Sequence, residues 1–295
     1  MIHARHGKEN NSMAIISISR GCFSHGKTIA EKIAQKLNYE CVDRVILLEA
    51  VEFFNISETK LLHSVNDAPG VLNKITHGRE KYLAYFQAAL LEHVKHDNVV
   101  YHGHAGHLLL PNLSHIMKVR IIADMADRIN FMQQEDHISA EEAQKRIKKD
   151  DRERANWTRY LYNRDIQDPS LYDMVINIAT FSIDDACDMI CHAINSGMFK
   201  TKPEDKQTLN DYAISCCIKA ALQELCEPEV SVHNGILRIQ VPPGKIRKSD
   251  FSRADVQSQL QESIKIGISN EIKKIAHRIS DVKHIVIDVD PPELL

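Results

Sequence analysis

The segment 21–28 carries the residue types that a protein chain uses to hold a run of phosphate groups. It reads Gly-Cys-Phe-Ser-His-Gly-Lys-Thr and matches the pattern G-x-x-x-x-G-K-[ST] in full. Glycines let the backbone curl around phosphate oxygens with its amides pointing inward, and the N-terminus of a following helix adds partial positive charge. We therefore expect Lys27 to reach the β- and γ-phosphates of a nucleotide and the Thr28 hydroxyl to ligate magnesium. The alternative is a glycine-rich turn before an amphipathic helix.

A second group of residues suited to phosphate chemistry lies between Lys145 and Arg164, where eight basic residues stand among three acidic ones. Phosphoryl transfer needs cations around the transferring group, and the guanidinium fork matches phosphate oxygens. We expect the preceding helix to end near residue 149, so that Arg152 and Arg154 lie beyond it in a lid. Arg146 is equally well explained by a solvated helix face, since Glu142 stands four residues before it.

The elements around these residues predict an α/β fold. Short β-branched runs predict strands, and apolar residues at helical spacing predict helices. The expected strands are 14–18, 39–42, 98–102, 118–122 and 174–178, and the expected helices are 28–37, 80–96, 126–134, 139–149 and 183–195. Such alternation predicts a parallel sheet with helices on both faces, with the nucleotide at the carboxyl ends of the strands.

Three stretches of the chain are similar to the cytidylate kinase-like P-loop kinases, and the resemblance covers about residues 14–195. The first joins 16–27 and 30–34 to Val42-Asp43-Arg44, and the second is 99–106, Val-Val-Tyr-His-Gly-His-Ala-Gly. The third and most specific joins 139–143, 146–147 and 151–155 to 168–177, Asp-Pro-Ser-Leu-Tyr-Asp-Met-Val-Ile-Asn. The resemblance implies transfer of the γ-phosphoryl group of ATP to a nucleoside monophosphate, typically CMP or dCMP, with Mg²⁺.

The same resemblance, taken with the motifs, assigns roles to individual residues. The expected catalytic residues are Lys27, Arg152 and Arg154, and the expected acceptor-binding residues are Asp43, Arg44, Gly103 and His104. The expected ATP-binding residues are Gly21, Cys22, Phe23, Ser24, His25, Gly26, Lys27 and Thr28, and Thr28 is the expected metal ligand.

Departures from the family's pattern leave the acceptor open. Cytidylate kinases carry Gly-Arg-Asp where this chain has Gly103-His104-Ala105. An alanine side chain cannot accept a hydrogen bond from the cytosine amine, so base specificity is not fixed. The alternatives are a kinase for a different small-molecule acceptor and a non-catalytic ATP-binding sensor. Asp43 is a candidate for organising magnesium or the acceptor, or equally a helix N-cap.

Two clusters of metal-ligating residue types have simpler explanations. His102, His104 and His107 could suit zinc, but no nearby cysteine or carboxylate completes a ligand set. Cys187 and Cys191 stand four residues apart on an expected helix, where packing in the core is the better interpretation.

Composition excludes several classes of protein. With 43% hydrophobic and 26% charged residues the chain is neither disordered nor collagen-like, and a net charge of −3 argues against bulk binding to nucleic acid or anionic lipid. Seven irregularly spaced cysteines suggest reduced thiols. The first dozen residues lack the apolar run of a signal peptide, and no apolar stretch is long enough to span a bilayer. We therefore expect a cytoplasmic location.

The last third of the chain predicts a second, small α+β domain. A polar segment with Gly and Pro reads as a linker. Beyond it come an amphipathic helix, two alternating strands joined by Asn234-Gly235, a long helix and a last strand. This αββαβ order is similar to a BON domain, which implies ligand or lipid binding or self-association. We expect a tail at 1–12, the P-loop domain at 13–197, the linker at 198–208 and the BON-like domain at 209–295.

Overall fold

The computed structural model describes residues 13–43, 46, 52–54, 76–103, 105–223, 225–243, 245–246, 254–279, 282, 284–290 and 293–294. The predicted tail 1–12 and two predicted site residues, Arg44 and His104, lie outside this part of the chain. The described residues form two compact units, which we treat separately. The first comprises those within Met1–Val45 and His96–Asp205, and the second those within Ile46–Asn66, Ile75–Lys95 and Lys206–Leu295.

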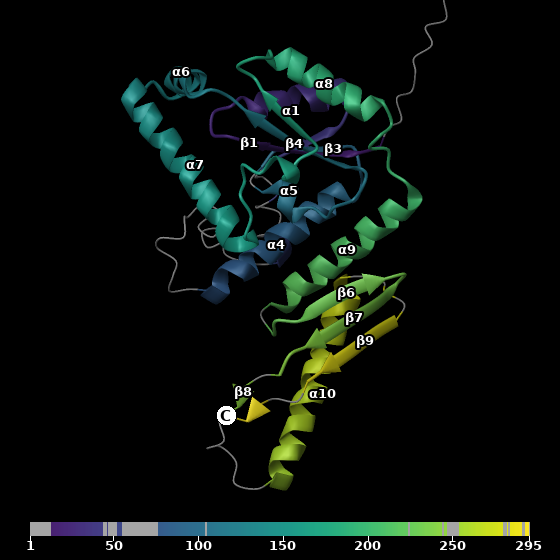
Figure 1. Ribbon diagram of the computed structural model, residues 1–295. Coiled ribbons are helices and arrows are strands. Elements are labelled where there is room, and N and C mark those ends of the chain that lie inside the picture. The colour runs from purple at the N-terminus through teal and green to yellow at the C-terminus, as the bar shows by residue number, and fades with distance from the viewer. Residues whose placement is uncertain are drawn as a thin grey trace, which may run out of the picture. The chain divides into compact units, whose positions relative to one another are not determined.

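The first unit is built on a five-stranded parallel sheet with strand order β2-β3-β1-β4-β5 (Figure 1). Its strands are β1 (Ile15–Arg20), β2 (Glu40–Val42), β3 (Val99–Tyr101), β4 (Ile116–Ile122) and β5 (Met174–Asn177). Each lies at a predicted position, with ends shifted by one or two residues. The central strand β1 is buried along almost its whole length because it has a neighbour on both sides.

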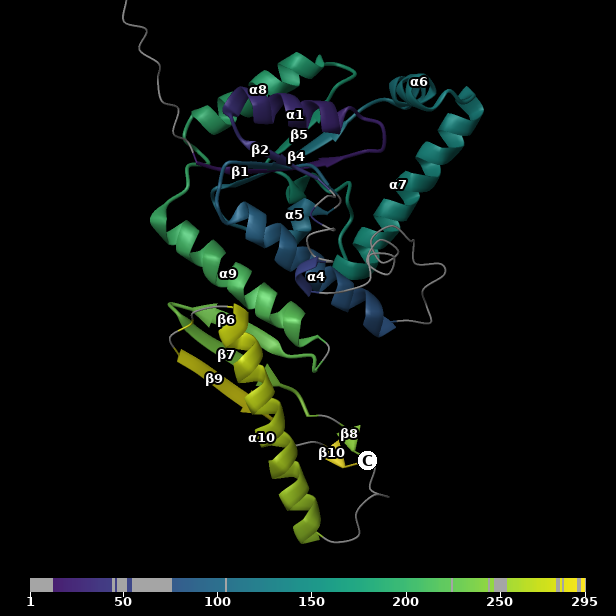
Figure 2. The same cartoon turned by 180° about the vertical axis from the view of Figure 1, so that it is seen from behind.

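Two helices cover one face of this sheet, α1 (Gly26–Leu37) and α8 (Ile183–Asn195), as Figure 2 shows. Lys32 and Lys36 of α1 pair with Asp184 and Asp188 of α8 at 2.7 and 2.6 Å. The core below them includes Ile16, Ile18, Val119 and Ile121 from the strands, Ile29 and Ile33 from α1, and Cys187, Ile190 and Cys191 from α8. The packing interpretation of the two cysteines is thereby confirmed.

The opposite face carries the short helix α5 (Gly106–Leu109). A Cβ on Gly106 would lie 2.5 Å from the Ser17 hydroxyl oxygen and 2.5 Å from the Tyr101 ring. Only glycine therefore allows α5 to approach β1 and β3 this closely. With helices on both faces of a parallel sheet, the predicted fold class is confirmed.

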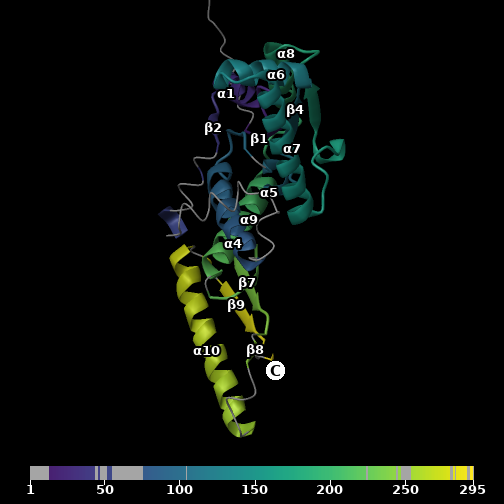
Figure 3. The ribbon, with the colours of Figure 1, turned by 90° about the vertical axis from the view of Figure 1, so that its left-hand side faces the viewer.

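A helical hairpin follows β4, formed by α6 (Met125–Asp136) and α7 (Ala140–Tyr162). The predicted end of the second helix near residue 149 is wrong, because α7 is 23 residues long and ends at Tyr162. No Gly or Pro interrupts residues 150–162, and Trp157 and Thr158 are buried in the extension. The views of Figures 1 and 3 agree that α7 runs from the level of α1 past the sheet to the level of α5.

The second unit contains a three-stranded mixed sheet, ordered β6-β7-β9. Its elements are α4 (Thr76–Val94), α9 (Pro203–Leu222), β6 (Glu229–His233), β7 (Ile236–Val241), α10 (Ala254–Ile279) and β9 (His284–Val289), with a small pair of strands, β8 (Lys245–Ile246) and β10 (Glu293–Leu294). Asn234 and Gly235 have positive φ values of 52° and 78°, as a tight hairpin requires.

The helix-strand-strand-helix-strand order of this unit agrees with the prediction. Helix α9 begins at Pro203, inside the segment expected to be a linker, and α4, expected in the first domain, groups with the second unit. The core unites Ile218 and Leu222 of α9, Leu237, Ile239 and Val241 of β7, Ile272 and Ala276 of α10, and Val289 of β9. Among the described helices, none is long and apolar enough to cross a bilayer.

Candidate phosphate-binding site

The loop between β1 and α1 turns sharply at two residues that are not glycine. Phe23 and His25 both have a φ of 55°, in the left-handed region that side chains seldom adopt. Gly26 then begins α1, and a Cβ there would lie 2.6 Å from Cδ of Arg20. Gly26 is therefore required by the return of the loop to the end of β1. The result is a curled backbone that leads directly into a helix N-terminus, as the motif predicts.

Hydrogen bonds fix the inner side of this loop to the sheet. The Ser24 hydroxyl donates to the Gly21 carbonyl oxygen at 2.9 Å and lies 3.3 Å from the Ile121 carbonyl oxygen. The amide of Gly21 donates to the same Ile121 oxygen at 3.3 Å. The Ser24 side chain is fully buried. It therefore stabilises the loop from within.

Helix α6 supports the loop from the outside through Phe131. The His25 ring stacks on the Phe131 ring with centroids 3.9 Å apart, and Phe23 meets it edge-on at 6.0 Å. Both residues with a left-handed backbone are thus in ring contact with one side chain of α6. Burial lowers the pKa of His25, so we expect a neutral ring at pH 7. Phe131 stands in no sequence motif, so its contact with the loop could not be predicted.

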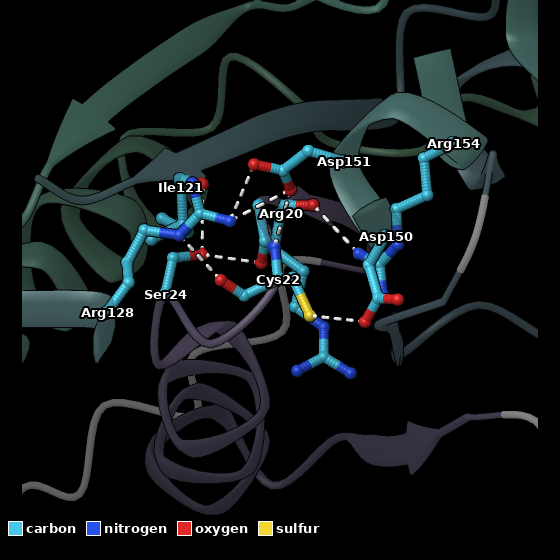
Figure 4. Close-up of polar contacts among 9 residues, drawn as sticks. Arg20, Cys22, Ser24, Ile121, Arg128, Asp150, Asp151 and Arg154 are labelled. Atoms are coloured by element: carbon cyan, nitrogen blue, oxygen red, sulfur yellow. Dashed lines mark hydrogen bonds and ion pairs between the residues drawn. The ribbon is translucent and has the colours of Figure 1, made fainter. Parts of the chain in front are cut away.

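A half-buried ion pair joins the loop to both helices of the hairpin (Figure 4). Arg128 of α6 donates from Nε to the Cys22 carbonyl oxygen at 2.7 Å and from one terminal nitrogen to both Asp151 oxygens at 2.7 and 2.8 Å. Asp151 of α7 also accepts from the Cys22 amide at 3.3 Å. The three residues close a ring of hydrogen bonds, so α6 and α7 hold the first turn of the loop.

The Cys22 thiol takes part in the same contact without being reactive. Its Sγ donates to the neighbouring carboxylate of Asp150 at 3.2 Å. Burial raises the pKa of this thiol to about 12, only partly opposed by the positive charge of Arg154. Because the thiolate is the nucleophilic form, Cys22 is a packing and hydrogen-bonding residue of the loop.

Replacing Asp151 by alanine is expected to lower the free energy of unfolding by roughly 1–3 kcal/mol, because the buried Arg128 guanidinium loses its partner. The Asp151 side chain is 36% exposed, so water screens the ion pair. This screening favours the lower end of the expected loss in stability. Asp150→Ala is the matched control, since it removes only the acceptor of a thiol, and we expect at most about 1 kcal/mol. Urea unfolding measures both, and equal losses would contradict the assigned role of the Arg128–Asp151 pair.

A cavity of about 420 Å³ opens beside the first glycine of the loop. Four arginines from four different elements line it, Arg20 of β1, Arg120 of β4, Arg128 of α6 and Arg154 of α7. The remaining lining residues are Gly21, Ile122, Ala123, Asp151, Ala155, Ile166, Gln167, Pro169 and Val175. The Arg20 side chain packs against Gly26 of α1, so the guanidinium groups of Arg120, Arg128 and Arg154 against the Asp151 carboxylate leave an excess of two positive charges, which favours a polyanion. We call this the arginine cavity.

The two arginines predicted in the lid lie on different sides of α7. Arg154 lines the arginine cavity, and one of its terminal nitrogens donates to the Arg20 carbonyl oxygen at 3.2 Å. Arg152 is exposed and is absent from the cavity lining. Because a helix turns about 100° per residue, the side chains of Arg152 and Arg154 point roughly 200° apart. The two arginines therefore cannot face the same cavity. Arg146 pairs with Glu142 and with Asp136 at 3.7 Å, which confirms its solvated-face interpretation.

The charges of Lys27 and Asp43 both act on His102, which follows the carboxyl end of β3. The His102 amide donates to the Val42 carbonyl oxygen at 3.0 Å, which ties the ends of β3 and β2 together. Burial lowers the pKa of the His102 ring, and the charges that act on it further are those of Arg20, Asp43, Glu31 and Lys27. The loop lysine and the candidate acceptor-binding carboxylate therefore share one electrostatic environment.

The segment that follows β3 is packed tightly. A Cβ on Gly103 would lie 2.0 Å from the Tyr101 hydroxyl oxygen, so glycine is required there by the packing of the chain itself. Ala105 is buried with a φ of 57°. Burial lowers the pKa of His107 to about 3. Within the described residues no three His, Cys, Asp or Glu side chains come together to hold a metal, so the zinc hypothesis gains no support.

The oxygen atoms near Lys27 suit Mg²⁺, which prefers hard oxygen ligands and keeps several of its waters. Thr28 stands in the first turn of α1 directly after Lys27. Asp43, close enough to His102 to act on its ring, stands on the same side of the sheet. The Thr28 hydroxyl and the Asp43 carboxylate are the side chains that would hold a magnesium ion here, directly or through water.

Comparison with known proteins gives three findings. A model of the cytidylate kinase-like family matches residues 15–180. A cytidylate kinase of Sulfolobus acidocaldarius is 37% identical over 101 residues, which are 34% of this chain and 54% of that protein, so the match spans about half of the relative's length. Among solved structures, an uncharacterized protein from Eubacterium ventriosum (19% identity, TM-score 0.48) covers 62% of this chain and 99% of its own, and a shikimate kinase from Bacteroides thetaiotaomicron (13%, 0.40) covers 62% and 98%.

Proposed function

The chain belongs to the cytidylate kinase-like family, and from this premise we propose that it transfers the γ-phosphoryl group of ATP to a nucleoside monophosphate, with CMP or dCMP the first candidates. The observation that carries the proposal is the arginine cavity beside the P-loop. A nucleoside monophosphate brings its own phosphate dianion to the site. A sugar or cyclohexene acceptor brings less charge or none, and would leave much of the positive excess without a partner.

We assign different roles to the backbone of the loop and to the cations around it. Backbone amides of 21–28 hold the phosphates of the donor, and the Lys27 ammonium binds the β- and γ-phosphates. Arg154 faces the transferring group from α7 and stabilises charge that spreads over it in the transition state. Magnesium held by Thr28 would neutralise phosphate charge. The attacking phosphate oxygen of the acceptor is already anionic at neutral pH, so we assign no general base.

Acceptor binding is the part of the proposal that the residues determine least. Asp43, Gly103 and the residues Arg44 and His104 remain the proposed acceptor-binding set. Ala105 is buried and turned into a left-handed conformation, so it offers no hydrogen bond to a base. This observation favours, as the second candidate, a kinase in the same family whose acceptor is recognised by its phosphate and not by a cytosine ring.

The test is magnesium-dependent ADP release from ATP with CMP, dCMP, UMP, AMP and GMP offered singly, and with shikimate and gluconate as acceptors that lack a phosphate. We expect acceleration by a nucleoside monophosphate and none by the two controls. Equal acceleration by all five monophosphates would favour the second candidate. Acceleration by shikimate or gluconate alone would overturn the assignment of the arginine cavity to an acceptor phosphate.

A non-catalytic ATP sensor is distinguished by hydrogen exchange. A kinase with Arg154 in its site should protect the amides of residues 150–154 strongly when ATP and an acceptor are added. These amides are already hydrogen-bonded within α7, so a sensor should leave their exchange rates unchanged when the ligands are added. The second unit, whose αββαβ order resembles a BON domain, would then report occupancy, and we propose ligand binding, lipid binding or self-association as its roles. Cosedimentation of the full chain with phospholipid vesicles, and its sedimentation alone, test the last two.

A reducing compartment remains our proposal for the location of the protein. All seven cysteines are free of disulfides. Burial raises the pKa of Cys216 to about 11 and that of Cys217 to about 12, so both are thiols at neutral pH. Such thiols are typical of cytoplasmic proteins.

A further inference from the structure

We propose that Tyr172 is a positioning residue whose hydroxyl holds the Arg120 guanidinium at the wall of the arginine cavity, so that Arg120 binds a phosphate group of the acceptor. The inference deepens the proposed function and rests on it. Tyr172 stands just before β5, at the end of the short 3-10 helix Pro169–Leu171, and its side chain is buried. The family pattern contains this tyrosine, but nothing in the sequence indicates what its hydroxyl does.

The hydroxyl of Tyr172 is surrounded by three strong hydrogen-bonding partners. It donates to the Ile166 carbonyl oxygen at 2.9 Å. A terminal nitrogen of Arg120 donates to it at 3.2 Å, and Nε2 of His107 lies at 3.2 Å. The Ser19 hydroxyl is farther away, at 3.5 Å. Segments from β4, α5 and the chain before β5 therefore meet at one oxygen atom.

The number of protons on each group determines the direction of each hydrogen bond at the Tyr172 hydroxyl. A phenol has one proton to donate and two lone pairs that accept. Ile166 receives the proton, and a guanidinium can only donate, so Arg120 takes one lone pair. His107 must then fill the other by donating from Nε2. Burial lowers the pKa of His107 to about 3, so the ring is neutral and carries its single proton on Nε2. In agreement, its Nδ1 is buried without a hydrogen-bond partner among the described residues.

Both the hydroxyl and the ring of Tyr172 contact the Arg120 guanidinium. The carbon of the guanidinium lies 5.5 Å from the centre of the Tyr172 ring, so the ring and the hydroxyl hold the same cation. One N–H of Arg120 is used by Tyr172 and others remain for phosphate oxygens. A side chain held before the ligand arrives loses less freedom on binding, which strengthens the interaction with phosphate.

Strand alternation explains why Arg120 reaches this place. Val119 and Ile121 of β4 belong to the core beneath α1 and α8. Arg120 lies between them and must point to the other face, where the arginine cavity opens. It pairs in register with Ser19 of β1 and Val175 of β5, so its backbone is fixed by neighbours on both sides.

Tyr172→Phe tests the role of the hydroxyl while keeping the ring and its packing. We expect the KM for the acceptor to rise about 5–10-fold, with kcat and the KM for ATP within about twofold of wild type. Arg120→Lys should raise the acceptor KM about 10–100-fold, since lysine loses the planar fork. Tyr212→Phe is the matched control, because its hydroxyl bonds Gln87 at 2.9 Å within the second unit, and it should change nothing.

The double variant decides whether Tyr172 acts through Arg120. If it does, Tyr172→Phe should add no more than about twofold to the acceptor KM of Arg120→Lys. Multiplicative effects would overturn the proposal. As an independent readout, the ¹⁵N shifts of His107 should report the Nε2–H tautomer in the wild type and lose that fixed tautomer in Tyr172→Phe. A proton on Nδ1 of His107 in the wild type would also overturn it.

A binding measurement separates failure of this inference from failure of the proposed function. Inorganic phosphate is titrated into the full chain carrying Lys27→Ala, with and without Tyr172→Phe. We expect the phosphate affinity to fall about 5–10-fold on loss of the hydroxyl, even if no nucleoside monophosphate turns out to be an acceptor. Unchanged affinity in a Tyr172→Phe protein with wild-type thermal stability would overturn the inference alone.

Discussion

Replacing Lys27 by alanine is expected to reduce ATP-dependent phosphoryl transfer by at least about 100-fold, because a cation on the β- and γ-phosphates is lost from the transition state. The fold should be unaffected. The Lys27 side chain is 60% exposed, and its ion pair with Glu31, at 3.7 Å, is of the surface kind that contributes little to stability. Initial rates of ADP release and a thermal melt measure the two effects.

Lys32→Ala is the control for this experiment. Lys32 lies on the same helix and pairs with Asp184 at 2.7 Å, on the side of α1 that packs against α8. We expect a rate within about twofold of wild type, since a surface charge away from the phosphates does not enter the transition state. A Lys27→Ala protein with wild-type activity would remove the P-loop from the mechanism.

Arg154→Ala and Arg152→Ala form a second pair of variants with very different expected outcomes. Loss of Arg154 should lower kcat roughly 10²–10³-fold, because its guanidinium faces the arginine cavity where charge develops. Loss of Arg152 should change kcat less than about twofold, because that side chain is exposed on the other side of α7. Steady-state kinetics with saturating ATP and acceptor give both numbers.

The helix geometry predicts that the loss of Arg154 lowers kcat more than the loss of Arg152. If Arg152→Ala were the more damaging change, α7 would have to turn or unwind when substrates bind. Equal and small effects would leave the transition state without a guanidinium from α7. Either result would contradict the assignment of Arg154 to the transferring group.

The sheet and the P-loop could be predicted because their signals are local. Residues 14–18 contain three isoleucines spread over both faces, as is typical of a central parallel strand, and β1 begins at Ile15. The loop motif predicts a tight return of the chain at Gly26, and the structure shows one. The Asn234-Gly235 turn likewise determines a hairpin by the φ values that it demands. In each case the residues that carry the signal are neighbours in the chain.

The length of α7 could not be predicted from such signals. Its sequence is very polar, so the apolar stripe on which helix prediction depends fades after Ile147. The extension is stabilised by partners far away in the sequence, such as Cys22, whose amide and thiol bond Asp151 and Asp150. On a continuous helix Arg152 and Arg154 lie on different faces. The two arginines are therefore not equivalent, although the sequence suggested that they were.

The roles of the other residues of the site could not be predicted from the sequence, for the same reason. Arg128 reads as one more charged residue on a surface helix, yet it is buried against the loop. Phe131 stands in no motif, and the stretch that contains Tyr172 does not indicate what its hydroxyl does. Their roles come from contacts with Cys22, His25 and Arg120, which lie 50 to more than 100 positions away in the chain. A pattern that recurs every two or four residues cannot report contacts of that range.

These contacts also change the picture of the lid. The arginine-rich segment is the second half of a continuous helix, joined to the P-loop through Asp151 and Arg128. The loop that we propose to hold the donor and the helix that carries Arg154 are therefore one hydrogen-bonded assembly. We expect changes at either end, such as Asp151→Ala, to raise the KM for ATP as well as to lower stability.

The most direct test of the central claim follows the phosphoryl group itself. The full chain is mixed with magnesium and ATP labelled in its γ-phosphate, with CMP, dCMP or another nucleoside monophosphate as acceptor, and the products are separated. The account predicts label in the nucleoside diphosphate formed from the acceptor, at a rate that Lys27→Ala abolishes. Tight binding of ATP with no label in any acceptor, or labelled diphosphate formed equally by Lys27→Ala, would contradict it.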